Sequence, residues 1–321
     1  MLILLFIAVC FVAFTNGANA NFKGVASIYG SGTASLRTTA WWGTAATFAG
    51  AITAVFFASG MASELAKKFT GRDLVPDALS QSPQFLLAVA LGAALTSFLA
   101  TRLSFPVSTT HALVGALVGA GLASGDHTVH FAVLLKTFVK PLLISPVLAI
   151  GVGALVHFIL KSVRLLPDHR TRTLDTLHFL SGGAASFARG LNDTPKMAAL
   201  LVVAQALDIR WGFAAVAVAM AVGGLLDARN VAETLGKKIT GMNPGEGFAA
   251  NVATALLVNA ATFHSLPVST THVSVGSLIG IGIVTRKTKW PGVAQIVLCW
   301  LVTLPCGAAL AALACWCMRG F

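Results

Sequence analysis

Two copies of one polar motif stand out in an otherwise apolar chain. Residues 104–111 read Ser-Phe-Pro-Val-Ser-Thr-Thr-His, and residues 265–272 repeat them with Leu in place of Phe. The proline should end the preceding helix, and Ser and Thr are favoured N-caps of a following one. A helix should therefore start within each motif. That start directs free N–H groups and a positive dipole end at the break, a combination that suits an oxyanion. The expected anion-binding residues are Ser108, Thr109, Thr110, Ser269, Thr270 and Thr271, with ordinary capping of a hairpin tip as the alternative.

A second repeated motif offers chemistry suited to a cation. Gly-Ala-Asn at residues 17–19 and Gly-Leu-Asn-Asp at residues 190–193 interrupt two otherwise apolar segments. Asparagine side chains and freed carbonyls can ligate a small cation, and a carboxylate at membrane depth is costly enough to indicate a function. We therefore expect a coupling-cation site formed by Asn19, Asn192 and Asp193 at two helix breaks. The alternative is a kink in each helix, capped by Asn.

Two lysines and two histidines accompany these motifs. Lys23 and Lys196 occupy the same repeat position, so attraction of an anion is one interpretation and snorkelling to an interface is the other. His111 and His272 close the Ser-Thr-Thr motifs, where they would contact the anion, carry a proton or simply pack.

The composition places these motifs in a membrane. The chain has 321 residues, of which 56% are hydrophobic and only 10% charged, and its mean hydropathy is +0.82. A soluble protein carries about 25% charged residues, so most of this surface should face lipid. The net charge of +11 lies mainly between apolar runs, which indicates membrane orientation or attraction of an anion rather than nucleic-acid binding. The five cysteines lie inside apolar stretches without histidines at ligand spacing, so no metal site and no cofactor are expected.

The order of the motifs indicates an internal duplication. Residues 17–23, 65–71 and 104–111 return in the same order as residues 190–196, 235–241 and 265–272. We expect a first repeat over residues 1–160, a basic cytoplasmic linker over 161–173 and a second repeat over 174–321. Each repeat holds an odd number of apolar segments, so the two should have opposite orientations. Basic residues are concentrated on the side of the linker, which places both termini outside.

The expected fold is an all-α polytopic membrane protein. About ten apolar segments follow one another, and two of them, residues 112–123 and 273–284, fall short of the ~20 residues that a spanning helix needs. Short segments suit broken helices and re-entrant hairpins buried in protein. The fold class is therefore two inverted-topology repeats with broken helices and re-entrant-type hairpins, and residues 2–14 begin the first transmembrane helix.

At these motifs the chain resembles the inorganic phosphate transporter family of phosphate permeases driven by sodium ions or protons. The resemblance rests on residues 17–24, residues 190–196 and the two Pro-Val-Ser-Thr-Thr-His copies, and it covers nearly the whole chain. It implies phosphate held between the two Ser/Thr-rich hairpins and cation coupling through the Asn-Asp motifs. One position departs from the family pattern, which has Asp after Asn in both repeats, because this chain has Ala20 in the first. Sulfate permeases of the same family alter such acidic positions.

The sequence therefore predicts a secondary active transporter, a cation-coupled symporter that takes up inorganic phosphate across the cytoplasmic membrane. A sulfate permease and an anion channel are the alternatives, and the choice between Na+ and H+ as coupling ion stays open. No catalytic residues are expected, because no nucleotide loop, metal cluster or complete Ser/His/Asp arrangement is present. The expected partners are the anion and the lipid bilayer, with no nucleic acid, and a homodimer is left open.

Overall fold

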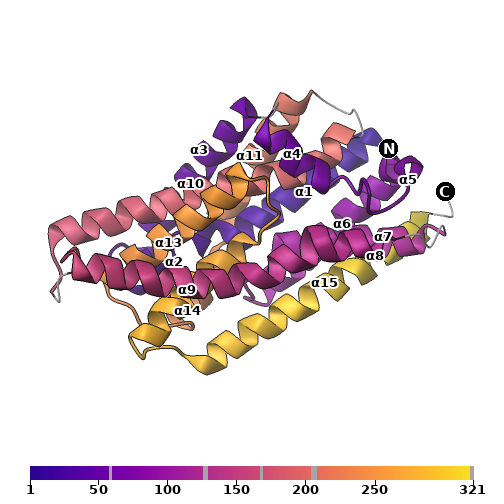
Figure 1. The fold of residues 1–321 in the computed structure, drawn as a ribbon. Helices are drawn as coiled ribbons and strands as arrows, with labels where there is room; N and C mark the ends of the chain where they lie inside the picture. The colour runs from indigo at the N-terminus through magenta and orange to yellow at the C-terminus, as the bar shows by residue number, and fades with distance from the viewer. Residues whose placement is uncertain (58–59, 126–128, 167–168, 204–207, 319–321) are drawn as a thin grey trace.

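The computed structural model describes residues 1–57, 60–125, 129–166, 169–203 and 208–318, and the fold of these residues is helical (Figure 1). The linker residues 167–168 and Arg319 lie outside the described residues. The first half of the chain forms α1 (Leu2–Ala20), the 3-10 turn η1 (Asn21–Lys23), α2 (Ala26–Gly30), α3 (Leu36–Phe56), α4 (Met61–Lys68), α5 (Asp77–Ser80), α6 (Pro83–Arg102), α7 (Thr109–Ala123), α8 (Phe131–Val133), the π-helix η2 (Leu134–Val139) and α9 (Lys140–Ser162). The second half forms α10 (Arg172–Val203), α11 (Ile209–Leu226), α12 (Arg229–Lys237), α13 (Pro244–Phe263), α14 (Thr270–Val284) and α15 (Trp290–Met318).

Several of these helices are suited to cross a membrane. Among the described residues, four continuous helical stretches are long and apolar enough: Leu2–Lys23, Pro83–Arg102, Phe131–Ser162 and Trp290–Met318. A fifth candidate is the pair formed by α11 and α12, which is bent by 74° at a short break. α7 and α14 are apolar but short, as the sequence predicted for these two segments. The chain is thus an all-helical, multi-pass membrane protein.

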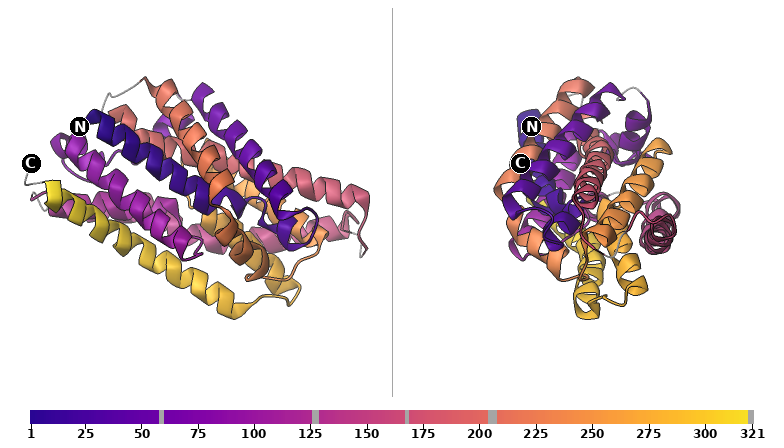
Figure 2. Two further views of the ribbon diagram at one scale, coloured as in Figure 1. Left: turned by 180° about the vertical axis from the view of Figure 1, so that it is seen from behind. Right: turned by 90° about the vertical axis from the view of Figure 1, so that its left-hand side faces the viewer.

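The two halves of the chain are interleaved rather than placed side by side. α1 of the first half packs against α11 of the second, α10 packs against α3, α15 against α7, and α14 against α9. α9 and α15 lie at the outside of the bundle (Figures 1 and 2). Their large side chains are exposed, such as Val147 at 70% and Leu301 at 67%, as expected for a surface that faces lipid.

Each Ser-Thr-Thr motif lies at the tip of a helical hairpin, α6–α7 or α13–α14. Ser104 and Ser265 take the left-handed conformation (φ 63° and 51°), which turns the chain out of the preceding helix. Ser108 and Ser269 then cap the next helix, because their side chains accept from the backbone N–H groups of His111 and His272. The N-caps confirm the predicted helix starts to within a few residues.

The predicted helix breaks at the two Asn motifs need correction. α1 continues through Gly17 and Asn19 to Ala20, and the chain leaves the helix only at Asn21, while α10 runs without interruption through Asn192 and Asp193. The polar side chains in these helices find partners on other helices. The backbone therefore need not open to satisfy them.

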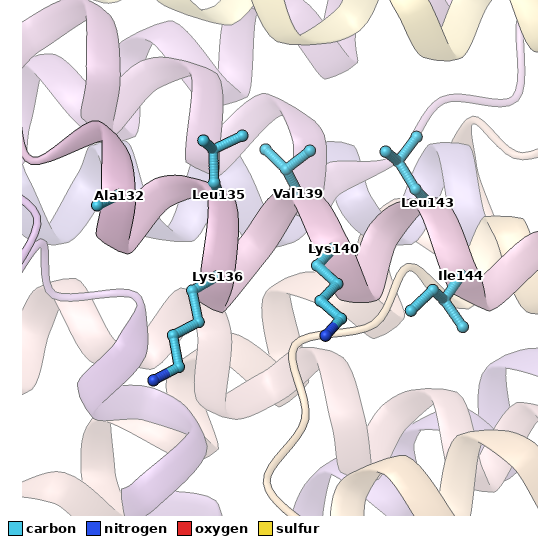
Figure 3. A pocket seen from close by; sticks show the side chains of 7 residues that line it. All are labelled: Ala132, Leu135, Lys136, Val139, Lys140, Leu143 and Ile144. Carbon is cyan, nitrogen blue, oxygen red and sulfur yellow. The ribbon is translucent and has the colours of Figure 1, made fainter.

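Two lysines, one in η2 and one at the start of α9, lie on the outer surface, away from the polar interior. Lys136 and Lys140 are exposed and point to one side of the helix, whereas Leu135, Val139 and Leu143 point to the other (Figure 3). Lysines on a lipid-facing helix extend their ammonium groups towards an interface.

α3 and α10 approach so closely that glycine is required at their contact. A Cβ atom on Gly190 would lie 2.0 Å from the carbonyl oxygen of Thr47, and one on Gly50 would lie 2.0 Å from that of Phe187. The backbones themselves are in contact, so neither helix can yield by a side-chain movement alone. This contact fixes the depth at which α10 presents its polar side chains.

We expect Gly190→Ala to lower the thermal unfolding temperature of the detergent-purified protein, by a destabilisation of about 1–3 kcal/mol from overpacking. Gly151 in α9 is the matched control, since a Cβ atom there meets nothing within 4 Å. Gly151→Ala should be neutral or slightly stabilising, because alanine is the better helix former. Equal unfolding temperatures for the two variants would contradict the close approach.

Candidate functional site

The tips of the two hairpins meet in the interior of the protein. The Thr110 hydroxyl of the first hairpin donates to the carbonyl oxygen of Val268 in the second, at 3.2 Å. The Thr271 hydroxyl of the second hairpin donates to the carbonyl oxygen of Val107 in the first, at 2.9 Å. These reciprocal bonds relate equivalent residues of the two repeats and bring the predicted anion-binding motifs together.

A lysine joins each of these pairs. Lys23 Nζ donates to the Val107 carbonyl at 2.8 Å, and Lys196 Nζ donates to the Val268 carbonyl at 2.8 Å. Both lysines are buried, with exposures of 4% and 1%, so neither side chain extends to an interface by snorkelling. Each hairpin carbonyl therefore accepts from a lysine of its own half and from a threonine of the other half.

Asp193 is the counterion in this interior. One carboxylate oxygen, Oδ1, lies 3.0 Å from Lys196 Nζ, and the other, Oδ2, lies 3.6 Å from Arg189 Nε. Oδ2 also accepts from the Thr270 hydroxyl at 3.2 Å and from the Asn16 amide at 3.3 Å. All of these side chains are buried, so water does not screen the charges.

The buried charges do not cancel. Lys23, Arg189 and Lys196 all interact electrostatically with Asp193, so three basic side chains share one carboxylate, a formal excess of two positive charges when all three are protonated. Among the residues that the structure describes, the other buried carboxylate is Glu246, which pairs with Lys287. Burying a net charge of this size inside a membrane protein costs a large free energy unless a ligand of opposite charge neutralises it. We call Lys23, Arg189, Asp193 and Lys196 the charged cluster.

The two asparagines predicted as cation ligands hold the hairpins. Asn19 donates from Nδ2 to the Thr101 hydroxyl (3.0 Å) and the Phe105 carbonyl (2.8 Å), and its Oδ1 accepts from the Val107 N–H (3.0 Å). Asn192 donates to the Thr262 hydroxyl at 2.8 Å, the equivalent contact in the second half. The polar groups of Asn19 are thus engaged in fixing the first hairpin tip.

The six predicted hydroxyls divide into two groups. Ser108 and Ser269 cap helices, the local role that the sequence offered as an alternative. The four threonines reach the charged cluster or its neighbours. Thr109 accepts from Asn16 at 2.9 Å, Thr270 donates to Asp193, and Thr110 and Thr271 lie beside the lysines as described above.

His111 and His272 pack against each other just behind the hairpin tips. Their ring centroids are 4.7 Å apart, and the His272 ring lies 4.0 Å from that of Trp300. His272 Nδ1 is 3.0 Å from the Leu142 carbonyl oxygen. These contacts agree with a packing role for the pair.

Comparison with known proteins matches this arrangement. Residues 16–311 match the model of the phosphate transporter family, a range that contains both hairpins and the charged cluster. The chain belongs to the phosphate transporter family. A protein of Rhizobium meliloti (strain 1021) described as a probable low-affinity inorganic phosphate transporter is 30% identical over 94% of this chain and 92% of its own length. A Bacillus subtilis (strain 168) protein of the same description is 30% identical over 81% of this chain and 84% of its own.

The fold of this family member also matches a solved structure. The structure of a sodium-dependent phosphate transporter superposes with a TM-score of 0.84 over 100% of this chain and 99% of the other, at 21% sequence identity. The family is one of transporters, which agrees with the exclusion of an enzyme from the sequence.

Two residues of the site in this family member were missed from the sequence. Arg189 is buried at 2% exposure and donates to the Thr47 hydroxyl at 3.1 Å and to Asn16 Oδ1 at 2.8 Å. Arg189 and Asn16 occupy the same repeat position, immediately before the matched glycines 190 and 17, so the two repeat mates contact each other. A signal was available, since an arginine within an apolar segment is costly unless it is paired or functional.

Proposed function

We propose that the chain is a secondary active transporter that carries inorganic phosphate across the cytoplasmic membrane, coupled to a cation. The observation that carries this proposal is the excess of two buried positive charges at the meeting point of the hairpins. Hydrogen phosphate is a dianion, so one bound ion would neutralise the cluster. Two ammonium groups and two threonine hydroxyls supply donors there, and such charge-assisted hydrogen bonds are the strong ones.

Within this proposal the predicted residues take two roles. Thr109, Thr110, Thr270 and Thr271, with Lys23 and Lys196, surround the anion, while Ser108 and Ser269 hold the helix starts that face it. Asn19, Asn192 and Asp193 form the side of the site that handles the coupling cation, with Asp193 as its carboxylate. The anion would replace Val107 and Val268 as acceptor for the lysines and threonines.

The proposed architecture is a pair of inverted repeats, residues 1–160 and 174–321, joined by the basic linker 161–173. The repeats would face each other at the hairpin tips, with the substrate between them, as is common in secondary transporters. In support, the start of α1 and the end of α15 lie at one end of the bundle, whereas the end of α9 and the start of α10 lie at the other (Figure 1). With the basic linker in the cytoplasm, both termini lie outside.

Uptake of labelled phosphate into proteoliposomes tests this proposal. We expect uptake of phosphate, stimulated by an inward gradient of the coupling cation. Phosphate uptake that responds to no cation gradient would remove the coupled-transporter proposal and leave the channel. Sulfate remains the alternative substrate, because Ala20 replaces the acidic residue expected at that position. Competition by unlabelled sulfate tests this alternative. Uptake of sulfate in preference to phosphate would make the chain a sulfate permease.

We expect Thr110→Val and Thr271→Val each to weaken phosphate binding about ten-fold or more. A hydrogen bond to a charged group contributes about 1.5–3 kcal/mol, and valine keeps the shape of threonine without its hydroxyl. The measurement is the phosphate concentration for half-maximal uptake. Thr53→Val is the matched control, because Thr53 is half-buried and donates to the Ala49 carbonyl of its own helix. Wild-type uptake after single removal of each of the six hydroxyls would make the hairpins structural only.

A further inference from the structure

The ammonium group of Lys196 has the surroundings that a metal cation would need. Three oxygens of different kinds converge on its Nζ: the Asp193 carboxylate at 3.0 Å, the Thr110 hydroxyl at 3.2 Å and the Val268 carbonyl at 2.8 Å. Carboxylate, hydroxyl and backbone carbonyl oxygens are the ligands that hard cations take, and transporters offer freed carbonyls to sodium in this way. In this chain those ligands surround a covalently attached cation instead.

The second Asp193 oxygen and the Val107 carbonyl of the first hairpin are also engaged. Asp193 Oδ2 faces Arg189, Thr270 and Asn16. In the first half, the Val107 carbonyl accepts from Lys23 and Thr271, and position 20, the repeat equivalent of Asp193, is an alanine. The oxygens around Lys196 and Asp193 therefore do not fit a coupling sodium ion, because each of them already binds an ammonium, guanidinium, amide or hydroxyl donor. Asn192 Oδ1 is buried without a hydrogen-bond partner among the described residues, but it is a single neutral oxygen.

The charge of the cluster adds to this mismatch. A sodium ion placed beside Asp193 would join three buried cations, and like charges a few ångströms apart repel strongly where water is excluded. The structural neighbour is a sodium-dependent phosphate transporter, yet at 21% identity it shares the fold without fixing the ion. In this chain, the basic side chains of the charged cluster supply the positive charge that a sodium ion would otherwise add beside the anion.

We propose that Lys196, with Lys23 as its counterpart, is the resident cation of the transport site, and that the protein binds and moves its anion without sodium. This inference rests on the proposed function, because it concerns the charge that neutralises phosphate during transport. The sequence left Na+ and H+ open as coupling ions. This inference excludes Na+ and retains H+.

The first test is exchange of phosphate in the absence of any ion gradient. Proteoliposomes loaded with unlabelled phosphate are placed in labelled phosphate, in sodium chloride or in choline chloride on both sides. We expect exchange rates within two-fold of each other in the two media. A ten-fold or greater loss in choline overturns the inference while leaving phosphate transport intact. Absence of exchange in both media instead contradicts the proposed function.

The second test measures sodium binding directly and needs no transport. Purified wild-type protein should show no saturable binding of 22Na+, with or without phosphate. In Lys196→Ala the three oxygens lose their ammonium, so saturable 22Na+ binding should appear, together with phosphate exchange that is faster in sodium than in choline. Lys68→Ala is the matched control, because Lys68 Nζ donates to the Ser265 carbonyl of the same hairpin, outside the charged cluster. This control should leave sodium binding absent.

Either of two results overturns the inference in this second test. One is saturable 22Na+ binding to the wild type, which stays informative even where the Lys196 variant fails to fold. The other is a folded Lys196→Ala protein that binds no sodium, because the oxygens around Nζ would then not form a cation site.

Discussion

Replacing Asp193 with Asn should abolish gradient-driven phosphate uptake. The substitution keeps the size of the side chain and removes the one carboxylate that faces Lys196 and Arg189. Removal of one partner from a buried ion pair costs about 3–5 kcal/mol, because the other charge stays buried without compensation. Here two cations lose their partner at once. We expect uptake to fall at least about 100-fold per folded molecule, together with a lower unfolding temperature.

Two further variants separate charge from structure in this prediction. Asp227 pairs with the exposed Arg102 at 3.5 Å, so Asp227→Asn should change neither uptake nor stability measurably. The double variant Asp193→Asn/Arg189→Gln keeps the excess of two positive charges and should regain most of the lost unfolding temperature. Normal driven uptake by Asp193→Asn would remove the coupling role of this residue.

The meeting of the hairpin tips was predictable because it depends on local chemistry and on repetition. Pro106 and Pro267 predicted that one helix ends before each motif, and the following serines cap the next helix, so the helix starts could be placed from the sequence alone. The duplication then indicated one such tip in each repeat. The resemblance to the family added the expectation that phosphate lies between them.

The partners of the charged side chains could not be obtained from the sequence. Lys196 contacts Asp193 three residues away, which helical spacing makes plausible, but its bond to the Val268 carbonyl depends on how the second hairpin enters the bundle. For the same reason the sequence could not show that the polar groups of Asn19 hold residues 101, 105 and 107. Residue type indicates what a side chain can bind, whereas the packing of distant helices decides what it does bind.

The uninterrupted course of α10 shows a second limit of sequence patterns. The polar residues 190–193 within an apolar segment predicted a broken helix, yet α10 extends from Arg172 to Val203 and includes Pro195. Asn192 and Asp193 bind groups on α13 and α14 through their side chains, so the polar interruption of the sequence is not an interruption of the helix. A pattern of polarity cannot distinguish an opened backbone from a helix whose polar side chains are satisfied elsewhere.

Introducing the missing carboxylate, with Ala20→Asp, should give the protein a cation requirement. Ala20 is fully buried at the end of α1, three residues before Lys23, which is the spacing of Asp193 and Lys196. A second carboxylate would lower the charge excess of the cluster from two to one. A bound dianion would then leave a net negative charge away from water, which is unfavourable unless another cation enters.

In choline medium we therefore expect Ala20→Asp to need about ten-fold more phosphate for half-maximal uptake, and sodium to restore the affinity. The phosphate-to-sulfate ratio should also rise, because hydrogen phosphate can donate a proton to a carboxylate and sulfate cannot. Ala20→Asn is the matched control, since it has the same size without the charge and should leave both the cation dependence and the anion ratio unchanged. If Ala20→Asp also leaves both unchanged, position 20 does not face the site, and the charge of the cluster is set without the first repeat's Asn motif.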